Sequence, residues 1–84
     1  MTNKEILKRK IIYRSEHRGT KEMDILLGNF VKMHINQLNE NELNELEKLL
    51  LLDDEILTNW YFEKKIDKTV PATTVSRMLK KFRL

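Results

Sequence analysis

Hydrophobic residues recur along most of the chain at intervals of three and four positions, which is the spacing of one face of an α-helix. The pattern predicts helices over residues 3–16 and 21–35, and a third that carries a run of leucines. A fourth helix is expected after the acidic group 53–55, and a short last one ends near residue 82. The sequence therefore predicts an all-α fold, a compact single-domain bundle of about five short helices over residues 1–84.

Residues that favour helix starts stand at the expected boundaries. Asn39 is followed by Glu42 and flanked by Leu38 and Leu43, the pattern of a capping box with a hydrophobic staple. The other expected caps are Thr2 or Asn3, Thr20, Asp53, and Thr73 or Thr74. The residues expected to face the core from the first two helices are Ile6, Leu7, Ile11, Ile12, Ile25, Leu26, Phe30, Val31 and Ile35. Inside the second helix, Gly28 is expected to permit close contact with another helix.

A charged stretch between the first two helices predicts a tight corner. Gly19 follows the first helix, and a glycine in that position usually adopts a positive φ that ends the helix. Glu22 and Asp24 fall in the first turn of the next helix, where the helix dipole favours negative charge. Arg18 stands beside the glycine with a planar set of donors. We expect the corner to present Arg18 and Glu22 to solvent. The plainer alternative is a helix cap with two solvated charges.

The composition narrows the class of protein. A chain of 84 residues has a thin core, because small domains bury a smaller fraction of their surface. There is no cysteine, which excludes disulfides and favours a reducing compartment, and the two histidines do not form a metal-binding pattern. No apolar run approaches the roughly 20 residues that cross a bilayer. We therefore expect a cytoplasmic protein without membrane insertion.

Charge is unevenly distributed along the chain. Basic residues dominate the two ends, whereas the middle third is acidic, and the net charge is +3. This layout favours an oriented protein partner. The main alternative is a small basic helical nucleic-acid-binding protein, which the sequence pI of about 9.3 permits but the acidic middle opposes. Catalysis by the chain alone is not expected, because the sequence has no nucleophile–base pair and no glycine-rich phosphate loop.

The spacing Arg18-Gly19-x-x-Glu22, followed by Met23-Asp24 and Leu26-Leu27, resembles the signature of the succinate dehydrogenase assembly factor family. This family comprises the bacterial SdhE type and its mitochondrial relatives, often called flavinators. The resemblance implies a compact helical protein that binds the flavoprotein subunit of succinate dehydrogenase and, as a further client, that of fumarate reductase. It also implies that the protein promotes covalent attachment of FAD to its partner and holds no cofactor stably itself.

The resemblance implies a set of partner-binding residues. Arg18, Gly19 and Glu22 match the family motif and would lie at the contact with the flavoprotein, together with Asp24 and the neighbouring His17. In this interpretation Gly19 permits close approach of the partner, while Arg18 and Glu22 offer it charge-assisted hydrogen bonds. The pair Asp53-Asp54 and Trp60 resemble the acidic cap and the aromatic residue of the family's penultimate helix.

Overall fold

The computed structural model describes residues 2–83, so Met1 and Leu84, the two ends of the expected domain, lie outside the described residues. Within that range the chain forms five α-helices and no strand, which confirms the all-α prediction. The helices are α1 (Asn3–Glu16), α2 (Lys21–His34), α3 (Glu40–Leu50), α4 (Asp54–Tyr61) and α5 (Thr74–Lys81). The principal extents are 38 × 24 × 20 Å.

Four of the five helices begin at a side-chain cap that the sequence predicts. Thr2, Thr20, Asn39 and Thr73 each accept a hydrogen bond from a backbone N–H of the following turn. The bond is reciprocal at Asn39, where the Glu42 carboxylate accepts from the Asn39 backbone N–H. Asp53 occupies the N-cap position of α4, but its side chain makes no capping bond within the described residues.

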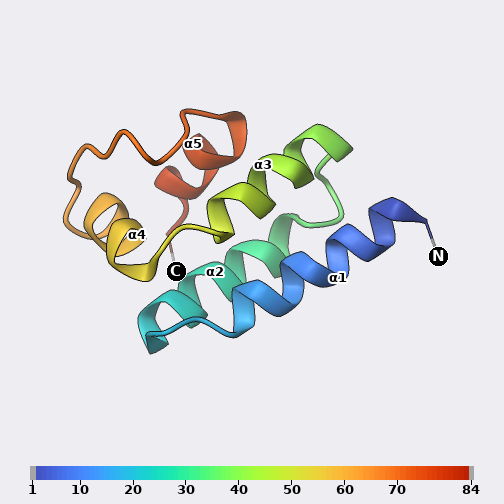
Figure 1. Ribbon diagram of the computed structural model, residues 1–84, viewed down its shortest axis with the longest axis horizontal. Coiled ribbons are helices and arrows are strands. Elements are labelled where there is room, and N and C mark those ends of the chain that lie inside the picture. The colour runs from blue at the N-terminus through green and yellow to red at the C-terminus, as the bar shows by residue number, and fades with distance from the viewer. Residues whose placement is uncertain (1, 84) are drawn as a thin grey trace.

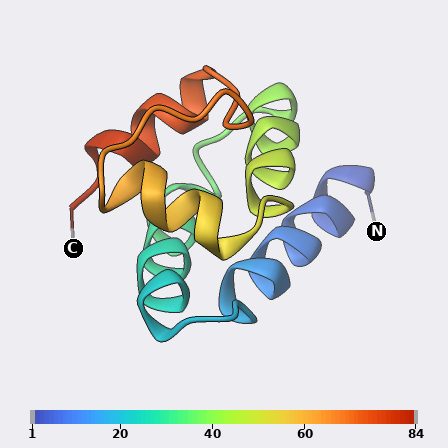
Figure 2. The ribbon, with the colours of Figure 1, turned by 60° about the vertical axis from the view of Figure 1, so that its left-hand side comes forward.

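The helices form a bundle in which α1 and α2 lie side by side and run in opposite directions (Figure 1). Helix α3 packs against both α1 and α5, and Phe82 at the end of α5 reaches Phe30 of α2, with a ring-centroid distance of 5.3 Å. Figure 2 shows that the loop between α1 and α2 comes close to the segment joining α3 to α4. Two segments far apart in sequence therefore meet at one end of the bundle.

The core draws on every helix and is rich in leucine. The largest fully buried side chains are Phe30, Ile11, Met23, Leu26, Leu27, Leu43, Leu46, Leu49, Leu50, Leu57, Leu79 and Val31. Three residues expected to face the core are instead 39–43% exposed, namely Ile6, Ile12 and Ile25. The apolar stripes of α1 and α2 are wider than the surface that a bundle of this size covers, so their edges remain in water.

Helix α2 contains a glycine near its centre and a histidine at its end. The expected close helix contact at Gly28 is wrong, because a Cβ atom built there would meet no heavy atom within 4 Å. His34, the last residue of α2, is half-buried. Its ring lies beside Phe30 and Phe82, with centroid distances of 4.8 and 6.0 Å. In the part of the chain described, no helix has the length and apolar character needed to cross a bilayer.

Candidate functional site

The corner between α1 and α2, residues 17–20, begins where the His17 side chain folds back on α1. His17 is the C-cap residue, and its Nδ1 atom lies 2.7 Å from the carbonyl oxygen of Tyr13. Because a carbonyl oxygen only accepts, Nδ1 must carry the proton in this contact. The imidazole also stacks on the Tyr13 ring, with a centroid distance of 3.9 Å and an interplanar angle of 18°. The last turn of α1 is thus closed by a histidine side chain.

Gly19 does not adopt the positive φ expected from the sequence, since no glycine in the described chain has one. A glycine is favoured at this position for a different reason. A Cβ atom at Gly19 would lie 3.0 Å from Oδ2 of Asp54, which is closer than ordinary van der Waals contact. The Asp54 carboxylate approaches so closely because Oδ2 accepts a hydrogen bond of 2.6 Å from the Gly19 backbone N–H. The missing side chain therefore makes room for an internal carboxylate.

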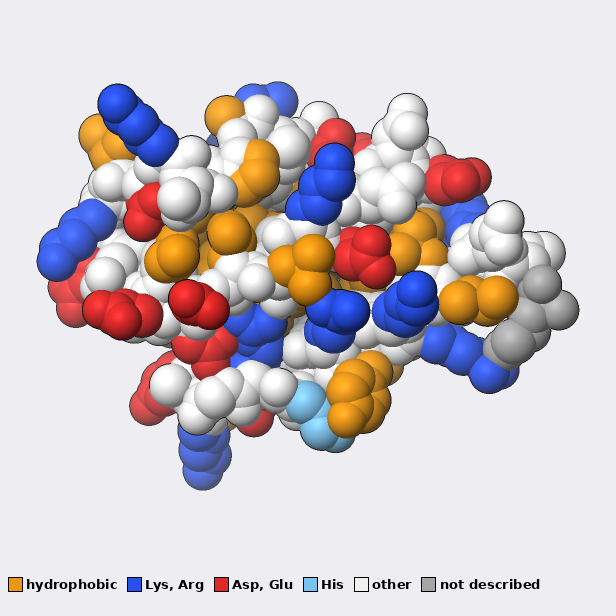
Figure 3. Space-filling view, in the orientation of Figure 1, with side chains coloured by type: hydrophobic (Ala, Val, Ile, Leu, Met, Phe, Trp, Pro, Cys, Tyr) orange, Lys and Arg blue, Asp and Glu red, His pale blue; other side chains and the backbone are white. Residues whose placement is uncertain are grey.

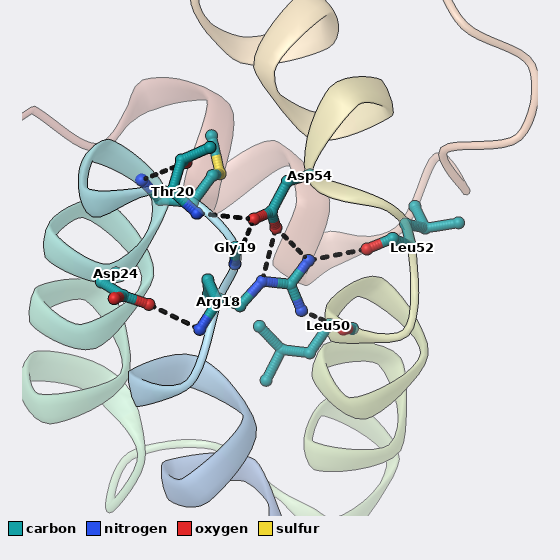
Figure 4. Close-up of polar contacts among 8 residues, drawn as sticks. Arg18, Gly19, Thr20, Asp24, Leu50, Leu52 and Asp54 are labelled. Carbon is teal, nitrogen blue, oxygen red and sulfur yellow. Dashed lines mark hydrogen bonds and ion pairs between the residues drawn. The ribbon is translucent and has the colours of Figure 1, made fainter.

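The Arg18 guanidinium points into the molecule and is held there by three groups (Figure 4). Its Nε donates to Oδ1 of Asp54 at 2.7 Å, and Nη2 lies 2.7 Å from the same oxygen. Nη2 also donates to the Leu52 carbonyl at 2.7 Å, and Nη1 donates to the Leu50 carbonyl. The expectation that Arg18 faces solvent is therefore wrong, because its side chain is only 9% exposed.

The two carbonyls that receive Arg18 belong to the end of α3 and the segment that follows it. The last carbonyls of a helix have no partner within the helix, and cationic side chains commonly satisfy them. Arg18 does so from the corner between α1 and α2. The same guanidinium pairs with Asp54, the first residue of α4. One side chain thus ties the corner to the α3–α4 junction.

The two carboxylate oxygens of Asp54 bind different groups of the corner, one the Arg18 side chain and the other the backbone. Oδ1 accepts from the Arg18 guanidinium, whereas Oδ2 accepts from the backbone N–H groups of Gly19 and Thr20, at 2.6 and 3.1 Å. The side chain is 16% exposed and lies in the first turn of α4, where the helix dipole stabilises a negative charge. We call the set formed by Arg18, Asp54, Gly19, Thr20 and the carbonyls of Leu50 and Leu52 the Arg18–Asp54 network.

Asp24 supports the corner from the other side. Its Oδ1 accepts a hydrogen bond of 2.6 Å from the backbone N–H of Arg18, and the residue is half-buried. Of the five residues that the sequence indicates, Arg18 and Asp24 thus engage their charged groups inside the molecule. His17, Gly19 and Glu22 are exposed.

The exposed side of the corner has a mixed character. A shallow hollow of about 500 Å³ is lined by Tyr13, Arg14, His17, Arg18, Gly19, Leu50, Leu51, Leu52, Asp53 and Asp54. Tyr13 and Leu51 are 62% and 57% exposed, so two large hydrophobic side chains border the hollow. Figure 3 shows acidic side chains gathered at the end of the molecule where α4 and the corner meet. Exposed hydrophobic groups with interspersed charges are typical of a protein-binding surface.

Sequence reasoning missed the residues that receive Arg18. Asp54 was indicated only as part of an acidic cap, and nothing in the local pattern singles out the carbonyls of Leu50 and Leu52. The sequence feature that could have indicated this partner of Arg18 is the second acid of Asp53-Asp54. Only one of two adjacent acids can occupy the N-cap, so the other is free to bind a distant residue.

Comparisons with known proteins agree with the family resemblance that the sequence indicates. Residues 9–83 match the family model described as flavinator of succinate dehydrogenase. The chain is 40% identical over 55 residues to the FAD assembly factor SdhE of Acetobacter pasteurianus, a match covering 66% of this chain and 50% of that protein. It is 38% identical over 60 residues to the mitochondrial succinate dehydrogenase assembly factor 2 of Dictyostelium discoideum, covering 71% and 43%.

The mitochondrial succinate dehydrogenase assembly factor 2 of Arabidopsis thaliana is 35% identical over 63 residues, covering 75% of this chain and 34% of that protein. The chain thus spans half or less of the length of these three relatives. No solved structure gave a significant match.

Proposed function

The chain belongs to the family of flavinators of succinate dehydrogenase, and from this premise we propose that it binds the flavoprotein subunit of that enzyme and promotes covalent attachment of FAD to it. The observation that carries the proposal is the corner of residues 17–20 with the adjoining Glu22, where the motif Arg18-Gly19-x-x-Glu22 lies. An internal network holds the corner, while His17, Gly19 and Glu22 remain exposed. A rigid corner loses little conformational entropy on docking, and this favours affinity.

In this proposal some of the motif residues contact the flavoprotein and others support the corner. Glu22 and His17 contact the flavoprotein through their side chains, and Gly19 contacts it through its backbone, where no side chain stands in the way. Arg18 and Asp24 belong to the same partner-binding site through the support that they give the corner. The hydrophobic border of Tyr13 and Leu51 supplies apolar area to the interface.

The covalent chemistry belongs to the flavin and the subunit. The chain acts by binding a conformation of the subunit that is competent for flavin attachment, which raises the population of that conformation. We extend the proposal to the flavoprotein of fumarate reductase as a second client. We further propose a single domain over residues 1–84, a cytoplasmic location, no catalytic activity of the chain's own, no stable FAD binding and no nucleic-acid partner.

Co-expression tests the proposal directly. The flavoprotein subunit is produced with and without this chain, separated on a denaturing gel and examined for flavin fluorescence, which survives denaturation only when FAD is covalently attached. We expect fluorescence of the subunit band to increase strongly with the chain, and the two proteins to co-purify. Equal fluorescence at equal amounts of subunit would contradict the proposal. Binding to arbitrary duplex DNA that weakens steeply with salt would favour the nucleic-acid alternative.

A further inference from the structure

We propose that Asp54 is the positioning residue of the partner-binding site: it holds the corner in the arrangement that the flavoprotein recognises, without touching the partner's flavin itself. This inference rests on the proposed function and deepens it, because Asp54 lies outside the motif Arg18-Gly19-x-x-Glu22. It comes from α4, 36 positions after Arg18 in the chain.

The two oxygens of Asp54 act on different parts of the corner. Oδ1 fixes the Arg18 side chain, and Oδ2 fixes the backbone by accepting from Gly19 and Thr20. Two successive backbone N–H groups directed at one carboxylate oxygen define the path of the chain there. His17 precedes this segment, and Glu22 follows it by two residues. The exposed groups that we assign to the contact are therefore placed by a residue from another helix.

Loss of this carboxylate should loosen the corner before it unfolds the protein. The bonds from Gly19 and Thr20 to Asp54 lie at the exposed side of the network, so water can replace Oδ2 as acceptor once it moves away. The core residues of α2 and α3, such as Leu27 and Leu46, are fully buried and do not depend on these bonds. The expected result is a mobile corner on an intact bundle.

The variant Asp54→Asn removes one of the two acceptor oxygens of Asp54 and changes the shape of the side chain little. Asparagine retains one acceptor oxygen, but its other terminal atom is an NH₂ donor. One orientation places this donor against the N–H groups of Gly19 and Thr20, and the other places it against the Arg18 guanidinium. In both orientations donors face donors. The matched control is Glu55→Gln, which removes the same charge at the next position from an exposed side chain in the first turn of α4.

The experiment compares three measurements on the full chain. Amide hydrogen exchange reports on Gly19 and Thr20, with Leu46 as the core reference; circular dichroism reports the folded fraction; and titration with the purified flavoprotein subunit reports affinity. For Asp54→Asn we expect the protection of Gly19 and Thr20 to be lost, whereas Leu46 stays protected to the extent that the remaining global stability sets. Binding should be about tenfold weaker if the corner adopts the bound arrangement a tenth of the time. Glu55→Gln should match the wild type in all three.

Affinity is measured at a temperature where every variant is fully folded, so a residue that only stabilises the fold would leave it unchanged. Wild-type affinity for Asp54→Asn would therefore overturn the inference, as would unchanged exchange at Gly19 and Thr20. Should Asp54→Asn fail to fold, Asp54→Glu retains the charge but adds a methylene group that shifts both oxygens away from the Arg18 guanidinium and the Gly19 and Thr20 N–H groups, and it must give the same two effects. If the wild-type chain does not bind the subunit, the proposed function fails as well; if it binds and Asp54→Asn binds equally, only this inference fails.

Discussion

The Arg18 guanidinium and the Asp54 carboxylate form an ion pair with Nη2 and Oδ1 2.7 Å apart, although 36 positions separate the two residues in the chain. The pair lies where the α1–α2 corner meets the start of α4, and both side chains are largely buried. Its surroundings complete it, because carbonyls take the remaining guanidinium donors and backbone N–H groups take the second carboxylate oxygen. A buried charge pair is tolerated when its other polar groups are satisfied in this way.

Removal of Arg18 should destabilise the protein strongly. Arg18→Ala leaves the Asp54 carboxylate without its counter-ion and two carbonyls without their donor, and we expect a loss of about 3 kcal/mol in the free energy of unfolding. For a domain of this size the melting temperature should fall by at least about 10 °C, measured by circular dichroism. Arg18→Lys should recover little of this, because an ammonium group cannot reproduce the planar set of donors.

The control for Arg18 is Arg9→Ala, which removes an exposed arginine from α1 and should change stability by less than about 0.5 kcal/mol. If the two alanine variants melt at the same temperature, the Arg18–Asp54 network does not stabilise the fold. A stable Arg18→Ala variant that keeps wild-type exchange at Gly19 and Thr20 but fails to bind the flavoprotein would instead restore the expectation from the sequence that this arginine acts at the partner.

The two glycines of the chain should respond oppositely to alanine. Gly28 lies inside α2, where an added Cβ meets nothing within 4 Å, so Gly28→Ala should stabilise by about 0.5–1 kcal/mol through lower backbone entropy in the unfolded state. Gly19→Ala places a Cβ 3.0 Å from Oδ2 of Asp54 and should weaken the bond from the Gly19 N–H, at a cost of about 1–2 kcal/mol. Thermal melts of both variants test the contrast.

Gly19→Asn separates the two explanations of this glycine. Asparagine tolerates positive φ better than alanine does, so it would be the milder substitution if the backbone were left-handed at this position. Since the φ of Gly19 is not positive and the constraint is the space taken by Asp54, the larger side chain should be no better than alanine. A clear advantage for asparagine would contradict the structural explanation.

Local features of this fold could be predicted from the sequence because they depend on residues close together in the chain. The five helices, the caps at Thr20 and Asn39, and the corner at residues 17–20 all follow from spacing and from side-chain chemistry within a few positions. The exposure of Ile25 did not follow, because it depends on where the other helices lie rather than on the periodicity of α2.

The candidate site could be predicted in position but not in orientation. The motif placed Arg18 and Glu22 at the corner, and Glu22 is exposed as expected. The direction of the guanidinium depends on Asp54 and on the end of α3, which reach the corner only after the bundle has formed. A local pattern contains no information on such a distant acceptor, so a solvent-facing arginine was the natural but wrong expectation.

Removal of the polar ring of His34 should stabilise the protein. Among the described residues its Nδ1 atom is buried and has no hydrogen-bond partner, while its ring packs beside Phe30 and Phe82. Replacing it by phenylalanine retains an aromatic ring and removes the unsatisfied nitrogen, so His34→Phe should stabilise by about 1 kcal/mol and raise the melting temperature by about 4–8 °C. A lower melting temperature would mean that the larger ring does not fit, or that water satisfies the nitrogen.

Glu22 provides the most direct test of the partner-binding surface, because the chain contains a close match for it. Glu22 and Glu40 are both exposed glutamates in the first turn of a helix, so each interacts with a helix dipole and each alanine variant should lose a similar amount of stability, about 0.3–1 kcal/mol. They differ in location. Glu22 follows the corner, whereas Glu40 lies beyond the opposite end of α2, a helix about 20 Å long.

If the corner binds the flavoprotein, Glu22→Ala should weaken the affinity about five- to tenfold through loss of a charge-assisted hydrogen bond, while Glu40→Ala should bind as the wild type does. Both affinities are measured by titration with the purified subunit, and both melting temperatures by circular dichroism. Because the two substitutions make the same change of charge in the first turn of a helix, a difference in affinity at equal stability would point to where the carboxylate lies. Equal affinities would remove Glu22 from the interface and shift the contact toward Tyr13, His17 and Leu51, which border the hollow beside the corner.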